Sequence, residues 1–143
     1  MKNKFVDQGV VGFTCGAFDL LHPGHVHLIM ECSKRCDYLI IGLHIDPTID
    51  RPDTKNRPLQ STFERWYQLA ALDIAGEIIP YETEQDLLRM LAVLPIQVRF
   101  IGSDYIGKPI TGEEMCQDRA IDIEYIHRLH DWSSTELRNR LKK

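Results

Sequence analysis

The sequence of 143 residues has few cysteines, no long hydrophobic run and no excess of positive charge. The hydrophobic runs are too short to cross a bilayer, which excludes a membrane-spanning helix. The formal net charge of −4 argues against a broad nucleic-acid surface, because such surfaces are basic. The negative net charge is still compatible with a small anionic ligand that is held by a few local cations. The first residues, MKNKFVDQGV, lack the apolar core and cleavage site of a signal peptide, so we expect a cytoplasmic protein.

The four cysteines form neither a CxxC pair nor a disulfide framework. Cys32 and Cys36 are spaced to share a helix face, but a zinc site there would need two more ligands. We therefore expect Cys15, Cys32, Cys36 and Cys116 to be reduced thiols.

Strand-like and helix-like segments alternate along the whole sequence. Hydrophobic residues make up 43% and charged residues 27%, which is typical of a globular protein. Apolar runs predict strands at residues 9–15, 38–45, 77–81, 97–102 and 121–127, and helical spacing predicts helices at 23–36, 61–74, 84–94 and 133–143. The alternation predicts one α/β domain over residues 1–143, with a mainly parallel sheet and right-handed crossovers.

Ligands of such sheets bind beyond the carboxyl ends of the strands. The segments at those ends are residues 16–25, 46–60, 103–112 and 127–134, and they hold the unusual polar residues of the sequence. The loop 46–60 contains three prolines and no periodic pattern, and its length is typical of a functional loop. We therefore expect the functional site at this edge of the sheet.

The turn after the first predicted strand contains two histidines, His22 and His25, around a Pro-Gly pair. One interpretation is an ordinary helix cap. A second is a zinc site with His27, but His25 and His27 would point to different helix faces. The third is an anion site, in which free N–H groups and the helix dipole face a phosphate beside the imidazoles. We prefer the third, because Gly16 and Gly24 would allow a close approach to the backbone.

Several segments resemble the motifs of one enzyme superfamily, in the same order. CGAFDLLHPGH resembles the HxGH signature of the nucleotidyltransferases, in particular of their cytidylyltransferase branch, and RPLQSTFERWYQLAAL, FIGSDYIGK and RLHDWSSTEL resemble later motifs. The resemblance implies a Rossmann-like α/β fold with a five-stranded parallel sheet and helices on both faces, commonly as a homodimer. It also implies transfer of a nucleoside monophosphate from a triphosphate to a phosphorylated acceptor, with Mg²⁺, release of pyrophosphate and no covalent enzyme intermediate.

The resemblance also implies roles for single residues. His22, His25, Lys55 and Arg128 form the implied catalytic set, in which the histidines contact the triphosphate. The implied nucleotide-binding residues are Thr14, Gly16, Ala17, Phe18, Asp19, Gly24, Arg65, Asp104, Ser133, Ser134 and Thr135, and the implied acceptor-binding residues are His44 and Arg57.

Some of these roles have alternatives. Asp19 either orients the backbone of its turn or lies near Mg²⁺, which is otherwise held mainly by the triphosphate. Arg57 could share or replace the role of Lys55. Arg65 lies near the phosphates or else forms a surface ion pair with Glu64 or Asp73.

Trp66 and Tyr67 are expected either in the core or at a dimer interface. Ser133 and Glu136 predict a capping box at the start of the last helix.

The motifs favour transfer of CMP from CTP to a small phosphorylated alcohol such as glycerol 3-phosphate. The sequence departs from the cytidylyltransferase pattern, because Asp73 replaces an arginine and Trp132 an isoleucine, and KNRPL is similar to the heptose-phosphate adenylyltransferase branch. Two alternatives therefore stay open: an adenylyltransferase that makes an ADP-sugar from ATP and a sugar phosphate, and a catalytically idle nucleotide-binding module.

Overall fold

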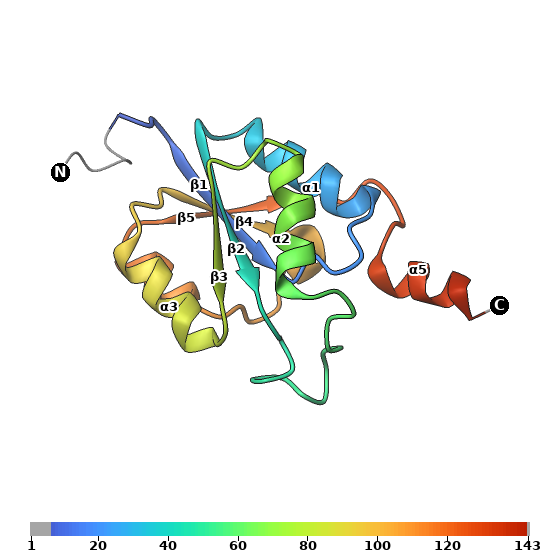
Figure 1. Cartoon of the computed structure of the whole chain (residues 1–143). Helices are drawn as coiled ribbons and strands as arrows, with labels where there is room; N and C mark the ends of the chain where they lie inside the picture. The colour runs from blue at the N-terminus through green and yellow to red at the C-terminus, as the bar shows by residue number, and fades with distance from the viewer. Residues whose placement is uncertain (1–6, 143) are drawn as a thin grey trace.

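The computed structural model describes residues 7–142, in which five parallel strands form one sheet (Figure 1). The strands are β1 (Val11–Gly16), β2 (Tyr38–His44), β3 (Glu77–Tyr81), β4 (Val98–Gly102) and β5 (Asp122–Ile126), in the spatial order β3-β2-β1-β4-β5. β1 lies in the middle, where Phe13 is opposite Ile40 of β2 and Arg99 of β4. The predicted Rossmann-like, five-stranded parallel sheet is confirmed.

Helices cover both faces of this sheet, as predicted. α1 (Pro23–Ser33) and α2 (Thr62–Ala71) pack on one face, and α3 (Glu84–Val93) and α4 (Glu113–Asp118) pack on the other (Figure 1). This arrangement explains why β2 is a continuous apolar run. Both faces of the strand are covered by helices, so Leu39 and Ile41 pack on the α1 side of the core and Ile40 packs on the α3 side. α5 (Ser134–Leu141) has no buried residue and lies at the side of the molecule, near α1. No helix within residues 7–142 has the length and apolarity needed to span a membrane.

Local capping chemistry sets several helix ends. Ser61 caps α2 and Thr83 caps α3, each with a complete capping box. Ser133 caps α5 by accepting from the Glu136 N–H at 3.0 Å. The Glu136 carboxylate bonds Arg140 at 2.8 Å instead of returning to the cap, so the predicted capping box of α5 is only half formed.

Several helices differ from the sequence prediction; α2, for example, ends at Ala71 rather than at residue 74. α1 ends at Ser33 rather than at Cys36. α4 was not predicted; it begins after Gly112, whose φ of 85° is the left-handed conformation that favours glycine. A short 3₁₀ helix, η1 (Ser103–Tyr105), also lies within the predicted loop after β4.

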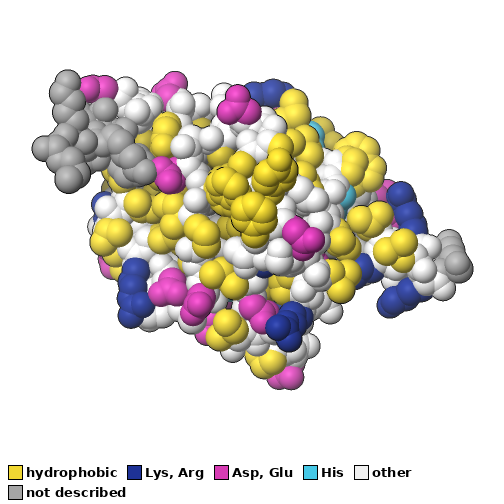
Figure 2. All heavy atoms as spheres, in the orientation of Figure 1, with side chains coloured by type: hydrophobic (Ala, Val, Ile, Leu, Met, Phe, Trp, Pro, Cys, Tyr) yellow, Lys and Arg dark blue, Asp and Glu magenta, His cyan; other side chains and the backbone are white. Residues whose placement is uncertain are grey.

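Hydrophobic side chains gather on the outer surface of α2 (Figure 2). Phe63, Trp66 and Tyr67 expose 67%, 38% and 63% of their surface, and the Phe63 ring lies about 6 Å from each of the other two. The expectation that Trp66 and Tyr67 lie in the core is therefore wrong. Their alternative role at a dimer interface stays a prediction.

Candidate functional site

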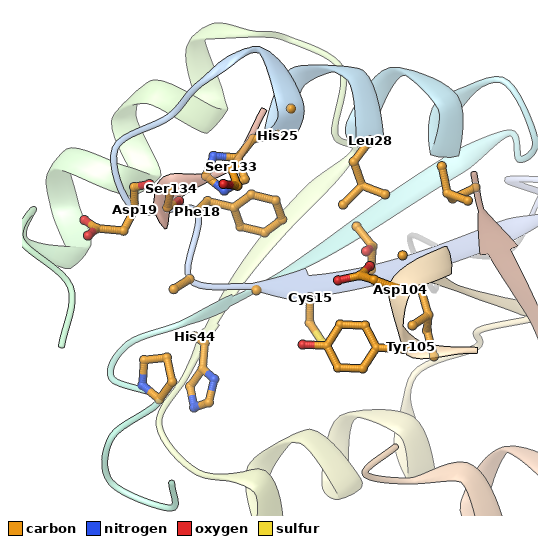
Figure 3. A pocket seen from close by; sticks show the side chains of 18 of the residues that line it. Cys15, Phe18, Asp19, His25, Leu28, His44, Asp104, Tyr105, Ser133 and Ser134 are labelled. Carbon is orange, nitrogen blue, oxygen red and sulfur yellow. Dashed lines mark hydrogen bonds between the residues drawn. The ribbon is translucent and has the colours of Figure 1, made fainter. Parts of the chain in front are cut away.

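A cavity of about 580 Å³ opens at the carboxyl edge of the sheet, where the sequence predicted the site. All six histidines of the chain line it. In Figure 3, His25, Ser133 and Ser134 lie on one side of the end of β1, and His44 and Tyr105 lie on the other. The charged lining residues are five cations (Arg51, Lys55, Arg99, Arg128, Arg138) and three acids (Asp19, Glu84, Asp104), a balance of +2 in a chain of net charge −4. The cavity thus concentrates positive charge and suits an anionic ligand.

The segment between β1 and α1 holds strained backbone beside the cavity. Phe18 and Leu20 have φ angles of 50° and 52°, in the left-handed region that costs a non-glycine residue about 1–2 kcal/mol. His22 then caps α1, because its Nδ1 accepts from the Gly24 N–H at 3.0 Å. A Cβ at position 24 would lie 2.8 Å from the His22 ring and 2.9 Å from the Trp132 carbonyl oxygen, so this position requires glycine.

His22 and His25 stack on each other with ring centroids 3.8 Å apart. Because Nδ1 of His22 is an acceptor, the neutral ring carries its proton on Nε2, which lies 3.3 Å from the Ser134 hydroxyl and donates to it. Burial lowers the pKa of His25 to about 3, and His22 adds to the shift while Asp19 opposes it. Burial and the charge of Arg128 also lower the pKa of His22. Both imidazoles are therefore neutral at pH 7 and offer hydrogen-bonding groups rather than cations to a ligand.

The Nδ1 atom of His25 is buried and has no hydrogen-bond partner within residues 7–142. A buried polar atom of this kind is costly to leave unpaired, and a ligand in the cavity is one way to satisfy it.

Asp19 connects three segments around the cavity. Its carboxylate accepts from the N–H groups of Leu59 and Gln60, both at 2.9 Å, and pairs with Arg138 of α5 at 2.7 Å. The Gln60 side chain in turn accepts from the Leu20 N–H at 2.8 Å. Asp19 therefore orients backbone, which is the first of its two predicted roles, although the backbone belongs to the loop before α2.

Two of the predicted catalytic residues, Arg128 and Lys55, lie in loops and place positive charge at the cavity. The Arg128 guanidinium donates to the Trp132 carbonyl oxygen, and the Arg128 N–H donates to the Ser103 hydroxyl at 3.2 Å. Lys55 Nζ lies 3.4 Å from the Tyr105 hydroxyl. Within the described part of the chain neither cation forms an ion pair, so both charges are available to an anion.

Arg65 has a different place from the predicted one. Its side chain is 2% exposed, and its guanidinium donates to the carbonyl oxygens of Ala17 (2.9 Å), His44 (2.7 Å), Ile45 (2.7 Å) and Gln60 (3.1 Å). It does not line the cavity. Both predictions for Arg65 are thus corrected: its donors are engaged by main-chain carbonyls rather than phosphates, and it is too buried for a surface ion pair.

The family of the chain follows from a comparison with known families. Residues 13–140 match the family described as cytidylyltransferase-like. The chain belongs to this family. Its members are nucleotidyltransferases, and the matched range contains every site residue proposed above from the sequence.

Curated relatives of similar sequence are longer than this chain. The bifunctional protein HldE of Bradyrhizobium sp. (strain ORS 278) is 34% identical over 132 residues, and that of Nitrobacter winogradskyi is 34% identical over 135 residues. These matches cover 92% and 94% of this chain but only 27% and 28% of the relatives. The chain therefore spans little more than a quarter of the relatives' length.

Solved structures support the same fold. The lipopolysaccharide core biosynthesis protein of Thermoplasma volcanium GSS1 superposes with a TM-score of 0.65 at 23% identity, over 87% of this chain and 99% of that protein. The pantoate-beta-alanine ligase of Francisella tularensis superposes with a TM-score of 0.65 at 17% identity, over 97% of this chain and 71% of that one. At these identities the likeness concerns the fold alone.

Most residues that the family resemblance implied do line the cavity, namely Thr14, Gly16, Ala17, Phe18, Asp19, His22, Gly24, His25, His44, Lys55, Asp104, Arg128, Ser133 and Ser134. Arg57 and Thr135 are exposed and lie outside the lining, which corrects their placement. Gly16 is not required for a close approach, since a Cβ there would make only ordinary contact with Phe18. The zinc interpretation has no support, because no three potential ligands converge among the residues that the structure describes.

Several lining residues were not predicted from the sequence. Arg138 follows Ser134 by four positions in α5, so helical spacing could have placed both on one face. Tyr81 ends β3 and Glu84 begins α3, and the carboxyl end of β3 was not among the predicted site segments. Arg99 lies inside β4, and no sequence signal distinguished it from a surface residue.

Proposed function

We propose that this chain transfers AMP from ATP to the phosphate of a sugar phosphate, which yields an ADP-sugar and pyrophosphate. The observation that carries nucleotidyl transfer is the convergence of all six histidines and five cations on one cavity in a chain of net charge −4. The curated HldE relatives support the adenylyl branch over the cytidylyl branch. The KNRPL segment, which is similar to the heptose-phosphate adenylyltransferase branch, supports the same choice.

The transfer needs positioning and charge neutralisation, and it needs no covalent enzyme intermediate. An oxygen of the acceptor phosphate attacks the α-phosphorus in line. The bond from that phosphorus to the bridging oxygen breaks, and its electron pair leaves with pyrophosphate. His22 and His25, neutral at pH 7, bond phosphoryl oxygens, while Arg128 and Lys55 offset the charge that gathers on them.

Mg²⁺ belongs to this proposal as a partner of the triphosphate. The residues of the chain do not form a dedicated cation cage, because no three potential ligands converge within residues 7–142 and Asp19 already bonds two N–H groups and Arg138. This fits Mg²⁺, which commonly keeps several waters and binds through substrate phosphates. When bound, it supplies further charge neutralisation at the phosphates.

Transfer of CMP from CTP to a small phosphorylated alcohol is the second candidate. The segment CGAFDLLHPGH and the cytidylyltransferase-like family match favour it.

A matrix of triphosphates and acceptors distinguishes the candidates. ATP and CTP are each combined with a heptose 1-phosphate and with glycerol 3-phosphate in the presence of Mg²⁺, and pyrophosphate release is measured. We expect the highest rate with ATP and the heptose phosphate. A higher rate with CTP and glycerol 3-phosphate would favour the second candidate, and no release in any combination would favour an idle nucleotide-binding module.

A further inference from the structure

The cavity has a second polar cluster on the α3 side of the sheet, away from the histidine pair. It consists of Arg51 from the loop after β2, Glu84 from the first turn of α3, Thr111 from the loop before α4, and Arg99 from β4, and all four residues line the cavity. None of them belongs to the motifs that identified the family.

The cluster is held in place by its own contacts. Arg51 Nε lies 3.0 Å from one oxygen of Glu84, and the Thr111 hydroxyl donates to the other at 2.8 Å. The buried Arg99 guanidinium donates to the Thr111 carbonyl oxygen, which fixes the loop before α4 to the sheet. The Asp50 carboxylate accepts from the Glu84 N–H at 2.8 Å, so the loop after β2 is attached to α3 twice.

The chemistry of the cluster differs from that of the histidine side. The side chains of Arg51 and Glu84 are 41% and 27% exposed, so an ion pair this accessible contributes little to stability. Besides its ion pair with Arg51, the Glu84 carboxylate accepts one hydrogen bond, from Thr111, and a carboxylate can accept several more, while a guanidinium donates up to five. Together they offer acceptors and donors at fixed positions, which matches adjacent hydroxyl groups, since each hydroxyl both donates and accepts.

The phosphates of the nucleotide do not account for this cluster. His22, His25, Ser134 and Arg128 provide the phosphate-binding groups near α1, and the negative charge of Glu84 would repel a phosphate. Lys55 lies beside Tyr105, whose hydroxyl is 3.4 Å from its Nζ. Its loop is attached to α3 through Arg51, because the Lys55 N–H donates to the Arg51 carbonyl oxygen at 3.1 Å.

We propose that Arg51, Glu84 and Thr111 bind the hydroxyl groups of a polyhydroxylated acceptor and thereby select a sugar phosphate over a short phosphorylated alcohol. The inference rests on the proposed nucleotidyl transfer and names residues that determine acceptor specificity. The phosphate of the acceptor lies toward Lys55, and its hydroxylated part lies against Glu84.

The test uses the full chain and two readouts. Binding of a heptose 1-phosphate and of glycerol 3-phosphate is measured by isothermal titration calorimetry without nucleotide, and the KM values for acceptor and triphosphate are measured by pyrophosphate release. The variants are Glu84→Ala, Glu84→Gln and Thr111→Val. The matched control is Glu114→Ala, which removes an exposed acid from the first turn of α4, outside the cavity lining.

We expect Glu84→Ala to weaken binding of the heptose phosphate at least ~10-fold, as for the loss of a charge-assisted hydrogen bond, with the triphosphate KM within ~2-fold of wild type. Glu84→Gln should recover part of the affinity, and Thr111→Val should lose less than Glu84→Ala. Glycerol 3-phosphate should respond little to any of these changes.

Two results would overturn the inference: a wild-type chain that does not bind the heptose phosphate, or Glu84→Ala and Thr111→Val variants that bind it as wild type does. An equal loss in Glu114→Ala would also overturn it, because the effect would then belong to helix stability. Normal sugar-phosphate binding by wild type without pyrophosphate release would refute the proposed nucleotidyl transfer alone.

Discussion

Replacing Arg65 by methionine tests the claim that this buried arginine holds the walls of the cavity together. Methionine keeps a long unbranched side chain but removes every N–H donor. The carbonyl oxygens of Ala17, His44, Ile45 and Gln60 each lose a charged donor. These carbonyls belong to the turn after β1, the end of β2 and the loop before α2, so the substitution disconnects three segments at once.

The size of the effect follows from these contacts. A buried acceptor left unpaired costs about 1–3 kcal/mol, and water can replace the lost donor where the carbonyl is only partly buried. With water serving about half of the four carbonyls, we expect the free energy of unfolding to fall by about 4 kcal/mol. For 143 residues, an unfolding entropy of about 2.1 cal/mol/K per residue gives about 0.3 kcal/mol/K, so the Tm should fall by about 13 °C.

Thermal and urea unfolding, followed by circular dichroism, measure this loss. Arg57→Met is the matched control, because Arg57 is exposed in the loop and its replacement should change stability by no more than ~0.5 kcal/mol. Arg65→Lys keeps the charge but not the planar fork of donors, so it should recover less than half of the loss. A Tm for Arg65→Met within 3 °C of wild type, or an equal fall in the Arg57 control, would refute the reasoning.

Two further predictions concern the proposed catalytic residues. His25→Gln should lower turnover at least ~100-fold, as for the loss of one transition-state contact. The same substitution should also make the free energy of unfolding depend less on pH. His25 has a pKa of about 3 in the fold against 6.5 for the ordinary group, so acidification protonates the unfolded chain first and wild type should lose about 2 kcal/mol between pH 7 and pH 5. Urea unfolding at both pH values measures this loss. If the variant lost as much unfolding free energy between pH 7 and pH 5 as wild type does, the prediction would be wrong. Lys55→Ala should slow pyrophosphate release while Arg57→Ala leaves it near wild type, since only Lys55 lines the cavity; the reverse order would show that the wrong loop cation was chosen.

The fold was largely predictable because its signals are local. The apolar run of β2 supplies side chains to the core on both faces of the sheet, and Ser61 supplies a capping box that marks the start of α2. α4 escaped prediction because it is six residues long and begins at a glycine rather than at a polar cap. Trp66 was misplaced because the sequence of an amphipathic helix does not show whether an aromatic residue lies in the core or on the surface.

The site was predictable where a motif or a strand end marked it, as at His22, His25 and Arg128. The site was not predictable where the role of a residue depends on which partners its long side chain contacts in the folded protein. Arg65 occupies the expected helix, but its guanidinium donates to carbonyl oxygens of three other segments, at Ala17, at His44 and Ile45, and at Gln60. Glu84 lines the cavity in contact with Arg51 and Thr111, which are distant from it in sequence.

The sequence by itself determined the α/β alternation, the parallel sheet and the edge at which the polar segments gather. These features follow from hydrophobic spacing and from the order of strands and helices, which are local properties of the sequence. Only the tertiary structure decided which cations face the cavity, which one is buried among carbonyls, and that both histidines of the HxGH turn are neutral. Those outcomes depend on desolvation and on partners brought together from remote segments, and neither can be read from the local order of residues.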